Sequence, residues 1–320
     1  MKGSDSISGS AQGPDTSSDR WELILNPTSG DADHAEDVRS RAAARDYVVR
    51  ETASEGDGIS LAKEAAESGA RSIAACGGDG TVHEVVYGLE RAGVLDDVTV
   101  AVVPAGTGNS FAGNVGVTSI EHAFELLDAG DGRRIDVGMA DDEPFPNSCI
   151  AGLTAKTSSE TSSALKDRVG TFAYVLNGLQ QTAEFEPMDV EIEIRGGPNV
   201  ESTTWTGEAL CLFVGNARRF VDGGGQADVE DGLLDVTIVE DMPTAEMLTE
   251  AAADQFFGRE TEHVTHLRAE RLDVASRDDR EIEFSLDGEM SSHRQLSLRV
   301  RPRALEVVVG EAYRPDPENR

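Results

Sequence analysis

The feature that most constrains the fold is a regular alternation of short apolar runs and helical segments from Trp21 to about residue 139. This alternation is typical of βαβ units, in which helices cover a parallel sheet. The sequence therefore predicts an α/β fold for this part of the chain. Strands are expected at 21–25, 47–50, 71–76, 98–103 and 133–139, and helices through about residue 45 and at 57–69, 81–92 and 118–129.

After about residue 140 the pattern changes, and strand-like runs dominate. Their alternation of apolar and polar residues is typical of antiparallel strands with one solvated face. Helical segments are expected only at roughly 168–183 and 244–257. We predict a polar tail over 1–20, an α/β domain over 21–138 and a β-rich substrate domain over 139–301. The expected strands of the β-rich part are 188–194, 208–215, 233–240, 263–276, 280–286, 294–301 and 304–309.

Charge and cysteine usage exclude several classes of function. The 60 acidic and 28 basic residues give a net charge of −32, spread along the whole chain. This indicates a high-salt cytoplasm, where self-repulsion is screened, and no basic stripe exists to bind nucleic acid. The three distant cysteines, Cys76, Cys149 and Cys211, fit no metal or disulfide framework and indicate a reducing compartment. No apolar run is long enough to span a membrane.

Three glycine-bearing loops follow consecutive expected strands, at 26–30, 77–81 and 104–109. Loops at the carboxyl ends of parallel strands share one sheet edge, and glycine lets backbone amides approach a phosphate. The chain has no GxxxxGK[ST] motif, and Gly106-x-Gly108 lacks the third glycine of a dinucleotide fingerprint. Each loop alone is more often a tight turn, with Thr81 and Glu84 as a capping box. Three such loops, one of them enclosing Asp79, favour a polyphosphate site.

The block GGDGTVHEV, preceded by LNPTSG and followed by VPAGTGNSFA, resembles the diacylglycerol kinase catalytic-domain family, which includes bacterial lipid kinases and sphingosine kinases. Blocks at 135–140, 213–236 and 285–289 match later parts of that family in the same order. The GGDGT block alone also occurs in NAD kinases and phosphofructokinases. The combination of blocks is more specific, and the resemblance extends from Trp21 to Val309.

The resemblance implies a three-layer α/β/α nucleotide-binding domain and a β-sandwich-like second domain, with ATP in the cleft between them. It also implies that strands near 302–311 return to the first domain, and that the protein forms a homodimer. The residues expected to hold the ATP phosphates are Asn26, Pro27, Gly77, Gly78, Gly80, Thr81, Gly106, Thr107, Gly108 and Asn109.

Phosphoryl transfer needs Mg²⁺ to neutralise the phosphates and an acceptor for the proton of the attacking hydroxyl. Carboxylates suit Mg²⁺ because it is a hard cation. Glu289 or Asp79 is expected to take the proton, while Asp287 and water hold Mg²⁺, with Asp136 as a further ligand. Family members bind a structural Mg²⁺ at the position of Asp231. The alternative for Asp231 and Asp287 is an ordinary turn.

The sequence departs from the family at Ser110, where the pattern GTxND places an aspartate. The expected function is an ATP- and Mg²⁺-dependent lipid kinase that acts on a diacylglycerol-like hydroxyl and docks transiently on a membrane. The alternatives are an NAD kinase-type phosphotransferase and a regulatory nucleotide-binding protein that has lost catalysis. Residues around Phe172, Tyr174, Val175 and Leu176 form either an apolar lip for the lipid or a core helix face.

Overall fold

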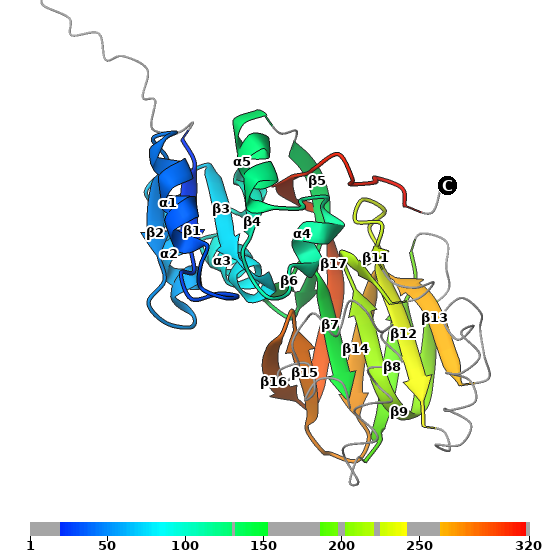
Figure 1. Cartoon of the computed structure of the whole chain (residues 1–320). Helices are drawn as coiled ribbons and strands as arrows, with labels where there is room; N and C mark the ends of the chain where they lie inside the picture. The colour runs from blue at the N-terminus through cyan, green and yellow to red at the C-terminus, as the bar shows by residue number, and fades with distance from the viewer. Residues whose placement is uncertain are drawn as a thin grey trace, which may run out of the picture.

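A computed structural model gives the fold of the chain over residues 20–129, 132–152, 186–197, 202–220, 225–241 and 263–317. The predicted helices at 168–183 and 244–257, the apolar stretch around Phe172 and most of the polar tail lie outside these described residues. Within them, a continuous series of hydrogen-bonded strands runs from one end of the molecule to the other. It begins in the α/β part and continues into the β-rich part (Figure 1).

The α/β part contains a parallel sheet of four strands in the order β2, β1, β3, β4. These strands span Val48–Glu51, Glu22–Leu25, Ser72–Gly77 and Thr99–Pro104. Strands β1, β3 and β4 are mostly buried, as expected for strands covered on both faces. The expected α/β architecture is confirmed here.

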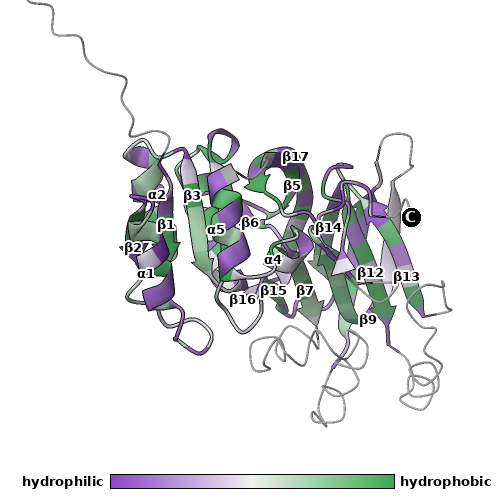
Figure 2. Ribbon diagram, turned by 45° about the horizontal axis from the view of Figure 1, so that its top comes forward, coloured by the Kyte–Doolittle hydropathy of each residue, from purple (hydrophilic) through white to green (hydrophobic). Residues whose placement is uncertain are grey.

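Helices cover both faces of this sheet (Figures 1 and 2). Helices α1 (Ala35–Ala43) and α5 (Ile120–Ala129) lie on one face, and α2 (Asp57–Glu67) and α3 (Asp79–Arg91) lie on the other. A short helix, α4 (Ser110–Asn114), follows β4, and a 3₁₀ turn, η1 (Leu95–Asp97), precedes it. The result is the predicted three-layer arrangement.

Thr81 and Glu84 do not form the capping box that their spacing suggests. Helix α3 begins at Asp79 rather than Thr81, so Thr81 lies inside its first turn. Glu84 instead accepts hydrogen bonds from the backbone N–H groups of Gly56 and Gly58, at 2.9 and 2.8 Å, and so caps the neighbouring helix α2. In α5 the cap is Ser119, whose hydroxyl accepts the N–H of His122 at 3.1 Å.

The β-rich part is built from antiparallel pairs, as the alternating pattern predicts. Figure 2 shows alternate hydrophobic and hydrophilic bands along its strands. The strands are β5 (Gly132–Ala140), β6 (Glu143–Phe145), β7 (Ser148–Gly152), β8 (Met188–Arg195), β9 (Thr203–Gly215), β10 (Arg218–Arg219), β11 (Gly225–Gln226), β12 (Leu234–Glu240), β13 (Val264–Ala269), β14 (Arg271–Ser276), β15 (Ile282–Leu286), β16 (Glu289–His293) and β17 (Gln295–Val308).

Strand β17 links the two parts. Its first half pairs with β14, and its second half pairs in parallel with β4 through Glu306 and Val307. Two runs that were predicted as separate strands are therefore one strand, with a register shift between Arg301 and Leu305. Pro302 lies in this bulge, where a residue without an N–H group breaks no regular ladder bond.

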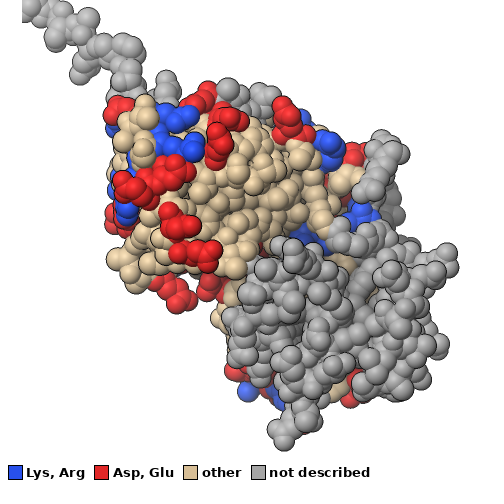
Figure 3. Space-filling view, viewed as in Figure 1, with Lys and Arg blue, Asp and Glu red and all other residues tan. Residues whose placement is uncertain are grey.

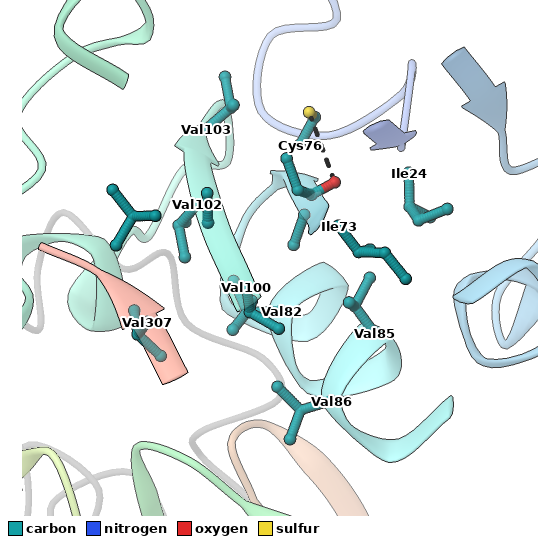
Figure 4. Close-up of a cluster of buried hydrophobic side chains, with 14 of the residues drawn as sticks. Ile24, Ile73, Cys76, Val82, Val85, Val86, Val100, Val102, Val103 and Val307 are labelled. Carbon is teal, nitrogen blue, oxygen red and sulfur yellow. Dashed lines mark hydrogen bonds between the residues drawn. The ribbon is translucent and has the colours of Figure 1, made fainter. Parts of the chain in front are cut away.

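Two clusters of buried apolar side chains correspond to the two parts. The first fills the α/β part, and Figure 4 shows Val82 and Val85 of α3 near Val100 and Ile73 of the sheet. The second lies among the strands of the β-rich part. Val307 of β17 belongs to the first cluster, whereas Leu298 of the same strand belongs to the second.

The surface carries the excess of acid. On the face shown in Figure 3, Asp and Glu side chains are scattered over the α/β part with Arg and Lys among them, and they form no single block. Over the described residues, no helix combines the length and apolarity that crossing a membrane would take.

Candidate active site

The three glycine-bearing loops lie together at the carboxyl edge of the parallel sheet. The Ser29 hydroxyl in the first loop donates to the Ala105 carbonyl in the third at 3.1 Å. The Ala105 N–H in turn donates to the carbonyl of Gly77, at the start of the second, at 2.9 Å. Chain order and strand polarity were sufficient to predict this juxtaposition.

Glycine is required where the loops touch. A Cβ on Gly106 would stand 2.3 Å from the Cα of Gly78, and a Cβ on Gly30 would stand 2.7 Å from the Ala105 carbonyl oxygen. Gly30 also has a φ of +58°, a conformation that side chains disfavour. Glycine at these positions costs backbone entropy on folding, but the absence of a side chain allows the three backbone segments to meet.

A cavity of about 590 Å³ opens at these loops. Its lining includes many of the residues predicted to hold phosphates, among them Gly78, Gly80, Thr107 and Gly108. Asp79, Asp287 and Glu289 also line it. Helix α3 begins at this cavity, and the first N–H groups of a helix, which have no partner within the helix, can bind anions. Backbone amides and carboxylates thus face one space, which suits a polyphosphate with its cation.

Three predicted phosphate-binding residues, Pro27, Gly77 and Asn109, are not part of the cavity lining. Asn109 folds back on its own loop, where its amide donates to the Gly106 carbonyl at 2.8 Å and its carbonyl accepts the Gly106 N–H at 3.0 Å. It therefore shapes the loop from within. Asn26 does line the cavity, and its side chain accepts the N–H of Thr28 at 3.1 Å.

The carboxylate of Asp79 is tied to the start of α4. Oδ1 accepts the N–H of Phe111 at 2.9 Å, and Oδ2 accepts the N–H of Ser110 at 3.1 Å. Each carboxylate oxygen has two lone pairs, so both can still accept a bond from water or a metal. Ser110, which replaces the family's aspartate, thus contributes its backbone to this contact and no second charge.

Asp287 and Glu289 reach the cavity from a hairpin of the β-rich part. Strands β15 and β16 pair Leu286 with Glu289, so Asp287 and Gly288 form a two-residue turn in which both have positive φ, +51° and +112°. Aspartate followed by glycine is a favoured sequence for such turns. Asp287 therefore lies in a turn, and this turn also brings Glu289 to the cavity.

The Asp287 carboxylate points inward. Its Oδ1 accepts the N–H groups of Asn147 and Ser148 at 3.1 and 2.6 Å, and its side chain is 1% exposed. Its Oδ2 is buried 3.5 Å from Nδ1 of His83. The role of Asp287 as a metal ligand stays a prediction.

Glu289 is half-buried, and its Oε1 stands 3.5 Å from the position that a Cβ on Gly80 would take. Burial raises the pKa of Glu289, and the carboxylates of Glu55, Glu84 and Glu143 raise it further, while His83 opposes them. A carboxyl with a raised pKa beside the glycine loop is suited to accept a proton.

Asp136 and Asp231 lie at a different place, where β5 meets the loop before β12. Asp136 is fully buried, and its two oxygens accept the N–H groups of Gly232 and Arg303, each at 2.7 Å. Asp231 contacts Arg268 at 3.2 Å, and burial together with Asp228 raises the pKa of Asp231 to about 6. Among the described residues, no group of three or more His, Cys, Asp or Glu side chains is arranged to hold a metal ion.

The sequence interpretation missed the loop after β2 and one histidine. The cavity lining includes Thr52, Ser54 and Glu55, because β2 ends at the same sheet edge as the glycine loops. The rule that loops at the carboxyl ends of parallel strands share one edge could have predicted these residues too. His83 is buried at 2% exposure between Asp287 and Glu143. Its only sequence signal was a position one helical turn after Asp79 on the same helix.

Glycine loops at one edge of an α/β sheet, with acidic residues of the β-rich part facing the same cavity, are the arrangement expected of a phosphotransferase. Family models match both parts of the chain: the diacylglycerol kinase catalytic domain over residues 20–140, and the YegS C-terminal NAD kinase beta sandwich-like domain over residues 147–309. The chain therefore belongs to the diacylglycerol kinase catalytic-domain family, together with the YegS-like proteins.

Curated relatives extend over most of the chain. A Stenotrophomonas maltophilia (strain K279a) protein named "probable lipid kinase YegS-like" is 31% identical over 88% of this chain and 94% of its own. A protein of the same name from Pseudomonas aeruginosa (strain UCBPP-PA14) is 34% identical over 83% and 86%. A crystal structure from Bacillus anthracis str. Sterne, provisionally called a diacylglycerol kinase, shares the fold with a TM-score of 0.73, at 24% identity over 92% and 98%.

Proposed function

We propose that this protein is an ATP- and Mg²⁺-dependent lipid kinase that transfers the γ-phosphate to the hydroxyl of a diacylglycerol-like lipid. The observation that carries the proposal is the meeting of three glycine loops with Asp79 and Glu289 around one cavity. The names of the relatives, probable lipid kinases, favour a lipid as the acceptor.

The residues that line the cavity fit a nucleotide held as its magnesium complex. The loops offer backbone amides to the phosphates, whereas the charged side chains of the described lining are all acidic. Mg²⁺, when bound, neutralises the phosphates and polarises the reacting phosphoryl group. Asp79 offers carboxylate oxygens for that cation or its waters, and the amides of Gly78 and Gly80 position the phosphates.

Glu289 serves in this proposal as the general base. It takes the proton of the lipid hydroxyl as the oxygen attacks the γ-phosphorus, and ADP leaves with the electron pair of the broken P–O bond. Its place on the hairpin puts it opposite the phosphate loop rather than within it. The acceptor lipid resides in a membrane, so we propose that the protein docks transiently at a membrane surface.

Radiolabelled ATP decides between the candidate functions. The protein is incubated with ATP and Mg²⁺ together with a host lipid extract, with NAD, or with neither, and a fourth arm adds EDTA to the lipid reaction. Label in the organic phase that EDTA removes supports the proposal. Label on NAD indicates an NAD kinase-type enzyme instead, and ATP binding without any transfer indicates a regulatory protein.

A further inference from the structure

His83 lies at the meeting point of three elements that surround the cavity. It belongs to α3, and its ring is buried, with 2% of its surface exposed. Its Nδ1 stands 3.5 Å from Oδ2 of Asp287 in the β15–β16 turn, and its Nε2 stands 3.2 Å from Oε1 of Glu143 in β6. One imidazole therefore faces a carboxylate on each side.

The side facing Asp287 is unusual. Both His83 Nδ1 and Asp287 Oδ2 are buried, and neither has a hydrogen-bond partner within normal geometry. A buried polar atom without a partner costs free energy, and each of these two atoms has the other as its facing polar group. Moving the hairpin away from α3 would separate these two atoms and leave each buried with no polar group facing it, so their proximity favours the observed position of the hairpin.

The contact between His83 and Asp287 links the two elements that carry Asp79 and Glu289, the acidic residues of the proposed reaction. Asp79 lies one helical turn before His83 on α3, and Glu289 lies two residues after Asp287 on the hairpin. Asp287 Oδ1 holds the other side of the turn through the N–H groups of Asn147 and Ser148. Through Asp287, His83 thus connects α3, which begins at the second glycine loop, to the hairpin that carries Glu289.

We propose that His83 is a positioning residue, which fixes the β15–β16 hairpin against α3 so that the Glu289 carboxylate faces the cavity at the distance the proton transfer needs. This inference rests on the proposed function for its catalytic consequence, while the structural link itself can be measured without a substrate. A displacement of about 1 Å in a reacting group can cost about 100-fold in rate.

Three variants test the proposal. His83→Ala removes both contacts, His83→Asn keeps an amide donor near the position of Nδ1 and can still reach Asp287, and Val86→Ala removes a fully buried side chain from the same helix without any polar contact. The first measurement is kcat and KM for ATP with the lipid acceptor. The second is amide hydrogen exchange over residues 282–293 in the protein without ligands.

We expect His83→Ala to lower kcat by about 10- to 100-fold, with KM for ATP changed less than about threefold, and to speed exchange in the hairpin. His83→Asn should recover most of the kcat, and Val86→Ala should lower the unfolding temperature while leaving kcat near the wild-type value. Wild-type kcat in His83→Ala, equal losses in the Asn and Ala variants, or unchanged hairpin exchange would overturn the proposal.

The exchange measurement keeps the two proposals separate. If the wild-type protein phosphorylates no lipid, the proposed function fails, and faster hairpin exchange in His83→Ala than in Val86→Ala still supports the link between helix and hairpin. If the wild type is active and that difference is absent, the assignment of His83 fails while the proposed function stands.

Discussion

At the scale of single residues, the Asp79 carboxylate serves both the fold and the proposed chemistry. It accepts the N–H groups of Ser110 and Phe111 at the start of α4, and it also lines the cavity. Asp79→Asn replaces one accepting oxygen by an amide that donates, so one of these bonds is lost. We expect the variant to stay folded, with stability lowered by about 1–3 kcal/mol, and to lose lipid phosphorylation by at least about 100-fold.

Label transfer and thermal unfolding, measured on the same preparation, check this expectation. Asp273→Asn is the matched control, because it removes one carboxylate paired with Arg271 on β14, outside the cavity lining. That control should keep wild-type transfer. Full activity in Asp79→Asn would remove Asp79 from the proposed machinery.

The meeting of the glycine loops around Asp79 could be predicted from the sequence, because each loop has a local pattern of glycines after an expected strand. Glycine is needed where two backbones approach closely, as they do at Gly78 and Gly106. The strand order shows which loops meet. His83 could not be found in this way, because its partners Asp287 and Glu143 come from distant segments. Its burial is a property of tertiary packing, and a histidine within a helical pattern carries no signal of what will face it.

At the scale of elements, the position of the β15–β16 hairpin determines the surroundings, and so the pKa, of Glu289. The hairpin inserts Glu289 among Glu55, Glu84 and Glu143, and burial together with these carboxylates raises the pKa of Glu289 above the ordinary value of 4.5. His83 acts against that rise. A general base works in its ionised form, so the rate is full above its pKa and declines as the pH falls through it.

We therefore expect the acidic decline of kcat/KM to lie above pH 4.5. Glu55→Gln removes one negative neighbour at an exposed position and should shift the decline to lower pH. Glu289→Gln should lower the rate by about 100-fold or more and abolish this decline. A pH–rate profile of the three proteins decides the matter, and an unchanged decline in the residual activity of Glu289→Gln would show that another group titrates.

Elements of the α/β part were predictable, because each strand and helix there shows its own period over enough residues. The β-rich part was less so. The run 263–276 looks like one strand, yet it divides into β13, which pairs with β12, and β14, which pairs with β8 and β17. The short strands β6, β7 and β16 were missed, since pairing partners rather than their own sequences define them.

At the scale of the whole molecule, like charge opposes compaction. The net charge of −32 is spread over the surface, because the 28 basic residues neutralise fewer than half of the 60 acidic ones. Exposed ion pairs such as Arg20–Asp46 contribute little individually, so they do not offset the collective repulsion. Screening by salt should therefore stabilise the folded chain, because repulsion falls most in the compact state.

We expect the unfolding temperature to rise by about 5 °C, or roughly 3 kcal/mol, as KCl increases from about 0.1 to 1 M, where the Debye length falls from about 10 to about 3 Å. Differential scanning calorimetry over a KCl series measures this. Because screening saturates, the gain should level off near 1 M, whereas a gain from general salt exclusion keeps growing at higher concentrations. An unfolding temperature that stays constant or falls over the first 1 M would show that surface repulsion does not limit the stability of this protein.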